Sequence, residues 1–498
     1  MNFRQSSQLD SELVFALIGP VGCNRKLIVQ IITDLAVHYS YKVVQVHLSD
    51  ALKPYVQVPD PKGDEYVRVS NLMQAGNELR LRTNDKAIFA KLAAAEINAQ
   101  RPSCSSGRTI FLIDSLKRPE EVEELRNIYG DGFYLFAIHA SEVSRDRYLE
   151  NHCHILSEKN RKALITRDKD DQLGHGQATS EAFHLADFFV AEDGSNTRVW
   201  NTMQRFFDLI FGKPFLTPTF NEYAMYMAYV ASMKSADLSR QVGAVITVEE
   251  DIVSTGANEC PKPGGGSYWP VFDQSTYRIF DIEGGRDYMN GFDKNGQDKD
   301  AMIAALKKGI PENVMQVLES NIRESGINDL TEYGRVVHAE MDAILGCARR
   351  GVSCRDSVLY STTFPCHNCA KHIIASGVKK VVFIEPYPKS RALDGHKDAI
   401  RTRALVRAGE DHKVLFLPFI GVGPKRFVDL FSMSLSSGEK IRRKEKGSFK
   451  AAQWQRAGAR PRLKLFDTSY IKNEIFVRDE AAKALCDIEK IVIPDEST

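Results

Sequence analysis

Two short segments of the chain combine residue types that bind metal ions. Positions 338–340 read His-Ala-Glu, and positions 365–369 read Pro-Cys-His-Asn-Cys. Two cysteines three residues apart project from one face of the first turn of a helix. The sulfurs of Cys366 and Cys369 can therefore converge on one ion, and His338 supplies a third ligand. Two thiolates and one neutral imidazole cancel the charge of Zn²⁺ and leave one tetrahedral position open to water. That open position is typical of catalytic zinc, so the pattern predicts one catalytic zinc ion per chain.

Glu340 is predicted to move protons and not to bind the metal. In the middle of a helix, residues two apart point roughly 200° away from each other, so we expect the His-Ala-Glu segment at a helix start. From there Glu340 can take a proton from a water at the ion and pass it to a substrate nitrogen. The alternative is a structural zinc knuckle, which needs a fourth ligand. The candidates near in sequence are His367, His372 and Cys347.

The spacing H-x-E … P-C-x-x-C resembles the signature of zinc-dependent nucleobase deaminases. The flanking sequence narrows this resemblance to one branch of the family. Segments 239–246 and 256–259 are similar to the entry hairpin of the deoxycytidylate deaminases, and segment 385–390 resembles the stretch past their last core strand.

The resemblance to deoxycytidylate deaminases also implies substrate contacts. It implies that Asn258 hydrogen-bonds the substrate sugar and that Arg240 and Tyr387 lie near the base and the phosphate. An amide offers both a donor and an acceptor, and a guanidinium grips phosphate bidentately. Alternatively, Asn258 is a turn residue, Arg240 forms a surface ion pair and Tyr387 is a packed aromatic residue.

The beginning of the chain alternates apolar strands with helices, which predicts a parallel sheet covered on both faces. Gly19, Gly22, Arg25 and Lys26 lie between the first strand and the first helix, where a phosphate-binding loop belongs. Such a loop ends in Gly-Lys-Ser/Thr, whereas positions 24–26 read Asn-Arg-Lys, so the hydroxyl that usually binds Mg²⁺ is missing. The helix N-terminus and the two cations still favour an anion.

Four later segments resemble landmarks of the nucleoside-monophosphate kinases, and the resemblance covers roughly residues 12–211. The segments are 114–118 (Asp-Ser-Leu-Lys-Arg), 145–148 (Arg-Asp-Arg-Tyr), 186–188 (Ala-Asp-Phe) and 193–195 (Asp-Gly-Ser). The resemblance and the altered loop together predict a degenerate domain that senses nucleotides or acts as a scaffold. Intact phosphoryl transfer and a purely structural role are the alternatives.

A degenerate kinase-like domain fused to a deaminase resembles the bacterial anti-phage dCTP deaminases. This resemblance implies hydrolysis of dCTP, and in some members of dCMP, to the uracil nucleotide, which deprives a replicating phage of a DNA precursor. A housekeeping dCMP deaminase, a polynucleotide cytosine deaminase and a nucleotide-binding protein with structural zinc are the competing hypotheses. The family often forms hexamers, so a homo-oligomer is expected.

The expected fold class is α/β: a P-loop nucleoside-monophosphate-kinase-like parallel sheet followed by a zinc cytidine-deaminase α/β/α domain. Pro and Gly interruptions place the first domain at 1–212, the deaminase domain at 213–430 and an extension at 431–498. An insertion at 259–335 begins and ends beside the metal-binding segments. We expect it to gate substrate access or to build the oligomer.

Composition limits the remaining possibilities. The 498 residues carry 66 Lys+Arg against 65 Asp+Glu, a net charge of +1, so no global field attracts polynucleotides or anionic membranes. The basic stretch at 440–464 holds ten Lys/Arg and one acid. It is expected to be solvated, with a regulatory RNA or a phosphate pocket as alternatives. No apolar run approaches the roughly 20 residues that span a bilayer. The polar start and the nine cysteines predict a reducing, cytoplasmic location.

Overall fold

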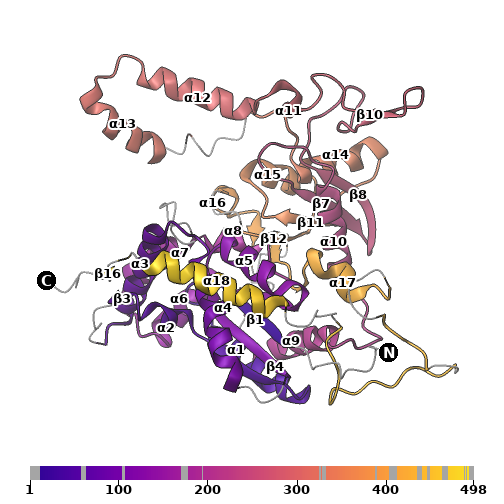
Figure 1. Ribbon diagram of the computed structural model, residues 1–498. Helices are drawn as coiled ribbons and strands as arrows, with labels where there is room; N and C mark the ends of the chain where they lie inside the picture. Colours follow the sequence, from indigo (N-terminus) through magenta and orange to yellow (C-terminus); the bar gives the residue numbers. More distant parts are fainter. Residues whose placement is uncertain are drawn as a thin grey trace. The chain divides into compact units, whose positions relative to one another are not determined.

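The computed structural model describes residues 12–57, 63–103, 107–169, 178–192, 195–324, 327, 333–386, 390–402, 412–434, 440–445, 449–462, 469–486, 488 and 491–492 (Figure 1). The chain forms two compact units. The first comprises residues 1–222 together with 420–498, and the second comprises residues 223–419. Both are mixed α/β structures built on sheets in which parallel pairs predominate, so the α/β fold class is confirmed.

The first unit is built on a six-stranded sheet with the order β15-β6-β5-β1-β4-β2. All neighbouring strands are parallel except β15, which pairs antiparallel with β6. The strands β1 and β5 are buried almost throughout, as their continuous apolar sequences predict. The strands are β1 (Leu13–Ile18), β2 (Lys42–Val46), β4 (Thr109–Leu116), β5 (Phe133–His139), β6 (Phe188–Ala191) and β15 (Gly421–Val422).

Helices cover this sheet, and a second, two-stranded sheet joins β3 (Val56–Gln57) to β16 (Ile491–Val492). The core contains stacked and tilted aromatic rings, among them Phe136 and Phe188 with ring centroids 5.1 Å apart. The helices are α1 (Arg25–His38), α2 (Leu48–Leu52), α3 (Glu65–Thr83), α4 (Ile88–Gln100), α5 (Pro119–Tyr129), α6 (Glu142–Asn151), α7 (Glu158–Lys169), α8 (Thr179–Phe183), α9 (Asn196–Ile210), α17 (Phe427–Phe431) and α18 (Ser469–Cys486).

Residues 420–498 belong to the first unit, whereas Pro and Gly interruptions in the sequence predict a separate extension at 431–498. The side chain of Arg426 is buried, with its Nε 3.1 Å from the Asp187 carboxylate, and its Nη2 donates to the backbone carbonyl of Phe133. In α18, Glu474 accepts two hydrogen bonds from Arg101 at 2.6 Å. Each of these contacts joins residues hundreds of positions apart, so local sequence patterns do not indicate them.

The second unit is built on a six-stranded sheet with the order β13-β14-β12-β11-β7-β8. The hairpin of β7 and β8 is antiparallel, β7 pairs antiparallel with β11, and the remaining pairs are parallel. The strands are β7 (Gly243–Val248), β8 (Asp251–Ala257), β11 (Val358–Thr363), β12 (Lys380–Glu385), β13 (Ile400–Arg401) and β14 (Val414–Pro418). The helices are α10 (Phe220–Ser232), which begins in the first unit, α14 (Ala339–Arg350), α15 (His367–Ala375) and α16 (Ala392–Gly395).

The predicted insertion leaves this sheet after β8. Glu259 and Val337 form an antiparallel bridge, with N···O distances of 3.2 and 3.1 Å, which joins the two ends of the insertion next to His338. Between them lie β9 (Val271–Asp273), β10 (Arg278–Phe280), α11 (Asp287–Asn290), α12 (Lys294–Lys307) and α13 (Glu312–Glu324). No residue of α12 is buried. Within the described part of the chain, no helix is both long enough and apolar enough to cross a membrane.

Candidate active site

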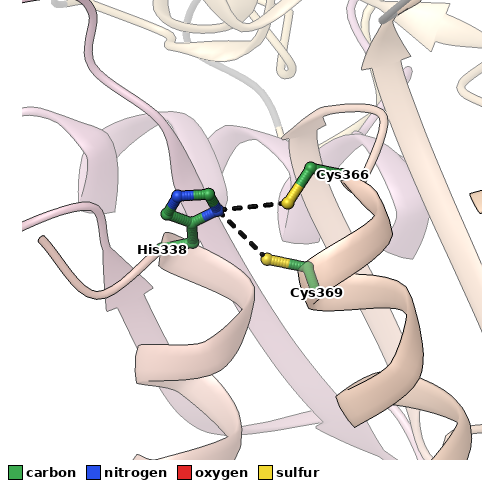
Figure 2. Close-up of side chains that lie close together, drawn as sticks. All are labelled: His338, Cys366 and Cys369. Carbon is green, nitrogen blue, oxygen red and sulfur yellow. Dashed lines mark hydrogen bonds between the residues drawn. The ribbon is translucent and has the colours of Figure 1, made fainter. Parts of the chain in front are cut away.

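His338, Cys366 and Cys369 come together where two helices begin. His338 is the N-cap of α14 and Cys366 is the N-cap of α15, with Cys369 one turn further along α15. The Nδ1 atom of His338 lies 3.3 Å from the Cys366 sulfur and 3.4 Å from the Cys369 sulfur (Figure 2). The three ligand atoms all lie within 4.8 Å of one another. The fold therefore brings the two metal-binding segments, 338–340 and 365–369, together in one cluster.

The donor set fits a zinc ion. Zinc prefers thiolate and imidazole ligands, and one imidazole nitrogen with two sulfurs at this separation can share a single tetrahedral ion. The contact between the two sulfurs lowers the pKa of Cys366 to about 4 and raises the pKa of Cys369. The two helix N-termini also favour negative charge at this position.

The arrangement of three residues also argues against a closed structural site. Among the described residues, no fourth Cys, His or acidic side chain joins the three ligand atoms as a group. Of the candidates named from the sequence, His372 directs Nδ1 to the backbone carbonyl of Asn368 at 2.7 Å. Cys347 lies in the interior of α14, away from its N-terminus. The group can therefore hold a zinc ion and leave a position for water.

Glu340 lies beside this group, in the first turn of α14, and is 4% exposed. Its Oε2 accepts from the Cys369 thiol at 3.3 Å, and its Oε1 accepts from the Ser361 hydroxyl at 3.1 Å. Burial raises the pKa of Glu340. A carboxyl group in this position can accept a proton and return it, which is the role predicted for it from the sequence.

The hairpin strand β8 sets the position of α14. At Gly256, a Cβ atom would lie 2.1 Å from the Ala339 carbonyl oxygen and 2.5 Å from the Ala343 nitrogen, so the helix backbone packs directly on the glycine. The Ser254 hydroxyl donates to the Ala343 carbonyl at 2.7 Å. The helix that carries Glu340, and the cap that carries His338, are therefore held close to the sheet.

Asn258 and Arg240 lie together on the loop before β7 and the end of β8. Asn258 is buried, and its side-chain oxygen accepts from the Val242 N–H at 2.7 Å while its Nδ2 donates to the Arg240 carbonyl at 2.8 Å. Arg240 is exposed, with Nη1 3.4 Å from the carboxylate of Glu385. Tyr387 lies outside the described residues. The amide of Asn258 is thus engaged with the backbone that carries Arg240.

The four residues predicted for a phosphate loop lie in the first unit, between β1 and α1. Arg25 donates from Nη1 to the Ser115 hydroxyl at 2.7 Å, and Lys26 is exposed. A Cβ atom at Gly22 would lie 2.8 Å from the Arg145 carbonyl oxygen, because α6 packs on the loop there. At Gly19, the backbone carbonyl accepts from Lys117 at 3.2 Å.

An internal carboxylate accepts from one backbone donor of this loop. The Val21 N–H donates to Asp168 at 2.7 Å, and Lys117 donates to the same carboxylate at 2.7 Å. Arg145 donates from Nε to the Val21 carbonyl at 2.7 Å. The loop is therefore bonded to side chains of its own unit. Asp168 is not indicated by the sequence, because its position near the loop depends on how α7 packs. Arg145 belongs to segment 145–148, one of the kinase-like landmarks of this region.

Comparison with known proteins identifies relatives of the second unit. The family described as "Cytidine and deoxycytidylate deaminase zinc-binding region" matches residues 218–385, a range that includes both metal-binding segments. The zinc cofactor predicted from the sequence is confirmed by this match and by the converging ligands.

Individual relatives match between about a third and two fifths of the chain. The deoxycytidylate deaminase of Enterobacteria phage T2 is 30% identical over 181 residues, which is 36% of this chain and 87% of the relative. The deoxycytidylate deaminase of Enterobacteria phage T4 is 29% identical over 181 residues, 36% of this chain and 84% of the relative. A solved structure, the apo dCMP deaminase of cyanophage S-TIM5, shares 17% identity with a TM-score of 0.22 and covers 41% of this chain and 99% of that chain.

Proposed function

Because the chain belongs to the cytidine and deoxycytidylate deaminase family, we propose that it hydrolyses the amino group of a deoxycytidine nucleotide. The observation that carries this proposal is the position of Glu340, whose Oε2 lies 3.3 Å from a sulfur of the three-residue metal group. In the proposed reaction water adds at C4 of cytosine and the bond from C4 to the amino nitrogen breaks. Ammonia is released, and the product is a uracil nucleotide.

The zinc ion, when bound, supplies Lewis acidity that activates water at neutral pH. Glu340 takes one proton from the attacking water and delivers it to the ring nitrogen N3, where it stays. It then carries the second proton, from the new C4 hydroxyl, to the departing amino group, so that ammonia leaves and C4 becomes a carbonyl. His338, Cys366 and Cys369 would hold the ion. The burial of Glu340 keeps this proton transfer away from bulk solvent.

dCMP is the first candidate substrate, because the relatives that cover this unit are named deoxycytidylate deaminases. dCTP is the second, on the resemblance of the fused chain to the anti-phage dCTP deaminases. Arg240 is exposed on the loop that Asn258 fixes, and its guanidinium suits a nucleotide phosphate. The resemblance of the flanking segments to the deoxycytidylate deaminases is the ground on which we place Arg240, Asn258 and Tyr387 in the substrate site.

The first unit, in this proposal, is a P-loop kinase-like domain that no longer transfers phosphate. Its central strands are parallel, and its loop joins β1 to α1, which supports the fold. The Val21 N–H is bonded to Asp168, and Lys26 stands where the Ser/Thr of the pattern would be, which speaks against catalysis. Depletion of dCTP during phage infection and a homo-oligomer such as a hexamer stay predictions of the resemblance. A regulatory RNA stays a prediction that rests on the basic stretch 440–464.

The experiment is a side-by-side assay. Purified zinc-loaded protein is incubated with dCMP, dCTP, CMP, CTP and a labelled single-stranded oligonucleotide, and uracil products and ammonia are measured. We expect dCMP or dCTP to be converted fastest. Glu340→Ala serves as the matched variant and is expected to lose turnover while it retains zinc. The better of the two substrates decides between a dCMP and a dCTP deaminase.

Two outcomes would contradict the proposal. One is the lack of any turnover by the zinc-loaded wild type, and the other is unchanged turnover by Glu340→Ala. An oligonucleotide converted faster than either free nucleotide would identify a polynucleotide deaminase in its place. If dCTP is converted, phage protection by a strain that expresses Glu340→Ala at the wild-type protein level tests the defence role, and full protection would exclude it.

A further inference from the structure

A buried serine on the central strand β11 contacts the proposed proton carrier. Ser361 has no exposed surface, and its Oγ lies 3.1 Å from Oε1 of Glu340. The strand register fixes its place, because Ser361 pairs with Ala244 on one side and with Phe383 on the other. A hydroxyl without a partner is costly to bury, and Glu340 provides the acceptor.

A second contact sets the direction of the serine hydroxyl. The backbone N–H of Thr363 donates to the Ser361 oxygen at 3.4 Å. An N–H can only donate, so the oxygen acts as the acceptor in this pair and its own hydrogen is directed to Glu340. Ser361 is therefore a donor to Oε1.

The two oxygens of the Glu340 carboxyl group thus face different partners. Oε1 faces Ser361 inside the sheet, and Oε2 lies next to Cys369 at the metal group. When Cys369 binds a metal ion it loses its proton and no longer donates to Oε2, whereas Oε1 keeps the hydrogen bond from the fixed Ser361 hydroxyl. A proton carried by Glu340 therefore belongs on Oε2, the oxygen on the side of the metal group.

We propose that Ser361 is a positioning residue for the deamination: it holds one oxygen of Glu340 so that the other collects and delivers the proton. This inference rests on the proposed function. Ser361 itself touches neither the metal ligands nor any group assigned to the substrate. Its effect should appear in the rate of the chemical step and not in the binding of the nucleotide.

Kinetics of matched serine variants test the proposal. In Ser361→Ala we expect kcat to fall about 10- to 100-fold with KM changed less than about twofold, because the carboxyl group is misplaced while the substrate contacts remain. Ser361→Thr keeps the hydroxyl on a β-branched residue and should retain most of kcat. Ser357→Ala removes another fully buried hydroxyl, which donates to the Cys354 carbonyl, and should leave kcat unchanged. In a Glu340→Gln background, Ser361→Ala should cause no further loss.

Crystal structures of zinc-loaded wild type and Ser361→Ala provide a readout that does not need turnover. We expect the Glu340 carboxyl group to occupy one orientation in the wild type and to rotate or split in the variant, with zinc content equal in both. A carboxyl group in the same place in both structures would overturn the proposal, as would a kcat of Ser361→Ala equal to that of the wild type. If no nucleotide is converted by the wild type, the proposed function fails, and the structures alone still decide whether Ser361 orients Glu340.

Discussion

Asn258 donates a hydrogen bond from Nδ2 to the backbone carbonyl of Arg240 at 2.8 Å, while its side-chain oxygen accepts from Val242. Asn258→Ala removes both bonds, so the loop that carries Arg240 should lose its fixed position. We expect KM for the nucleotide to rise, and the free energy of unfolding to fall by about 1–3 kcal/mol because a partly buried N–H loses its acceptor. Steady-state kinetics and urea unfolding measure the two effects.

A substrate without the 3′-hydroxyl separates this role from the sugar contact implied by the family resemblance. If Asn258 acts through Arg240, Asn258→Ala should raise KM by the same factor for deoxy and dideoxy nucleotides. If the wild type instead prefers deoxy over dideoxy nucleotides and Asn258→Ala loses this preference, Asn258 binds the sugar. Asn258→Asp, which keeps the acceptor for Val242, should fall between the wild type and Asn258→Ala in stability.

Gly256→Ala tests the contact between β8 and α14. The new Cβ would lie 2.1 Å from the Ala339 carbonyl oxygen, so the helix must move away from the sheet. We expect a loss of about 3 kcal/mol in the free energy of unfolding and weaker zinc retention, because His338 moves with the helix. Elemental analysis and thermal unfolding measure both.

Gly395→Ala is the matched control in the same unit, since nothing lies within 4 Å of its Cβ position. It should leave zinc content and stability near the wild-type values. Equal behaviour of the two alanine variants would refute the importance of the close approach at Gly256.

Cys366→Ser and Glu340→Gln are expected to separate metal binding from proton transfer. Cys366→Ser removes one of three ligands, so zinc content should fall well below one ion per chain and turnover should be lost with it. Glu340→Gln removes a proton carrier that is not a ligand, so zinc should stay and turnover should be lost. Elemental analysis with a parallel assay checks this. Cys153→Ser, a thiol in the first unit, is the control. Loss of zinc from Glu340→Gln would contradict the assignment of roles.

Asp168 should make the stability of the first unit depend on pH. Burial alone would raise the pKa of Asp168, but Lys117, the Val21 N–H and Arg145 outweigh it and hold this pKa below its ordinary value. Such a carboxylate stabilises the fold above the pKa that it has in the unfolded chain, and this contribution is lost as the pH falls through the folded-state pKa. Asp168→Asn should therefore cost about 3–5 kcal/mol near neutral pH and progressively less below about pH 4.

Urea unfolding at a series of pH values, compared with Asp50→Asn, checks this prediction. Asp50 forms an exposed pair with Lys53, so its variant should follow the wild type at every pH. A stability difference for Asp168→Asn that does not change between neutral and acid pH would show that the ionised carboxylate is not what stabilises the loop.

The metal ligands were predictable because their chemistry is encoded in short spacings. His338 lies at a helix start and Cys366 and Cys369 share one helical turn, both of which follow from periodicity. The contact between Ser361 and Glu340 left no distinct signal, because β11 reads Val-Leu-Tyr-Ser-Thr-Thr and its last three residues are all polar. Which of them meets Glu340 depends on the β7–β11–β12 register.

The packing of the last residues into the first unit left no signal either. Glu222 and Val422 are 200 positions apart, yet the carboxylate accepts from the Val422 N–H at 2.9 Å. Contacts of this kind join residues that are far apart in the sequence, so they depend on the tertiary fold. The composition of a basic or apolar stretch does not indicate which distant residues it will contact.

The pairing of β15 with β6 has a consequence for biosynthesis. The ribosome makes residues 223–419 after most of the first sheet and before its edge strand, so the nascent amino-terminal unit emerges incomplete. It must wait, with the edge of β6 uncovered, while the zinc-binding unit is translated. The first sheet can therefore gain its edge strand only after the second unit has been translated.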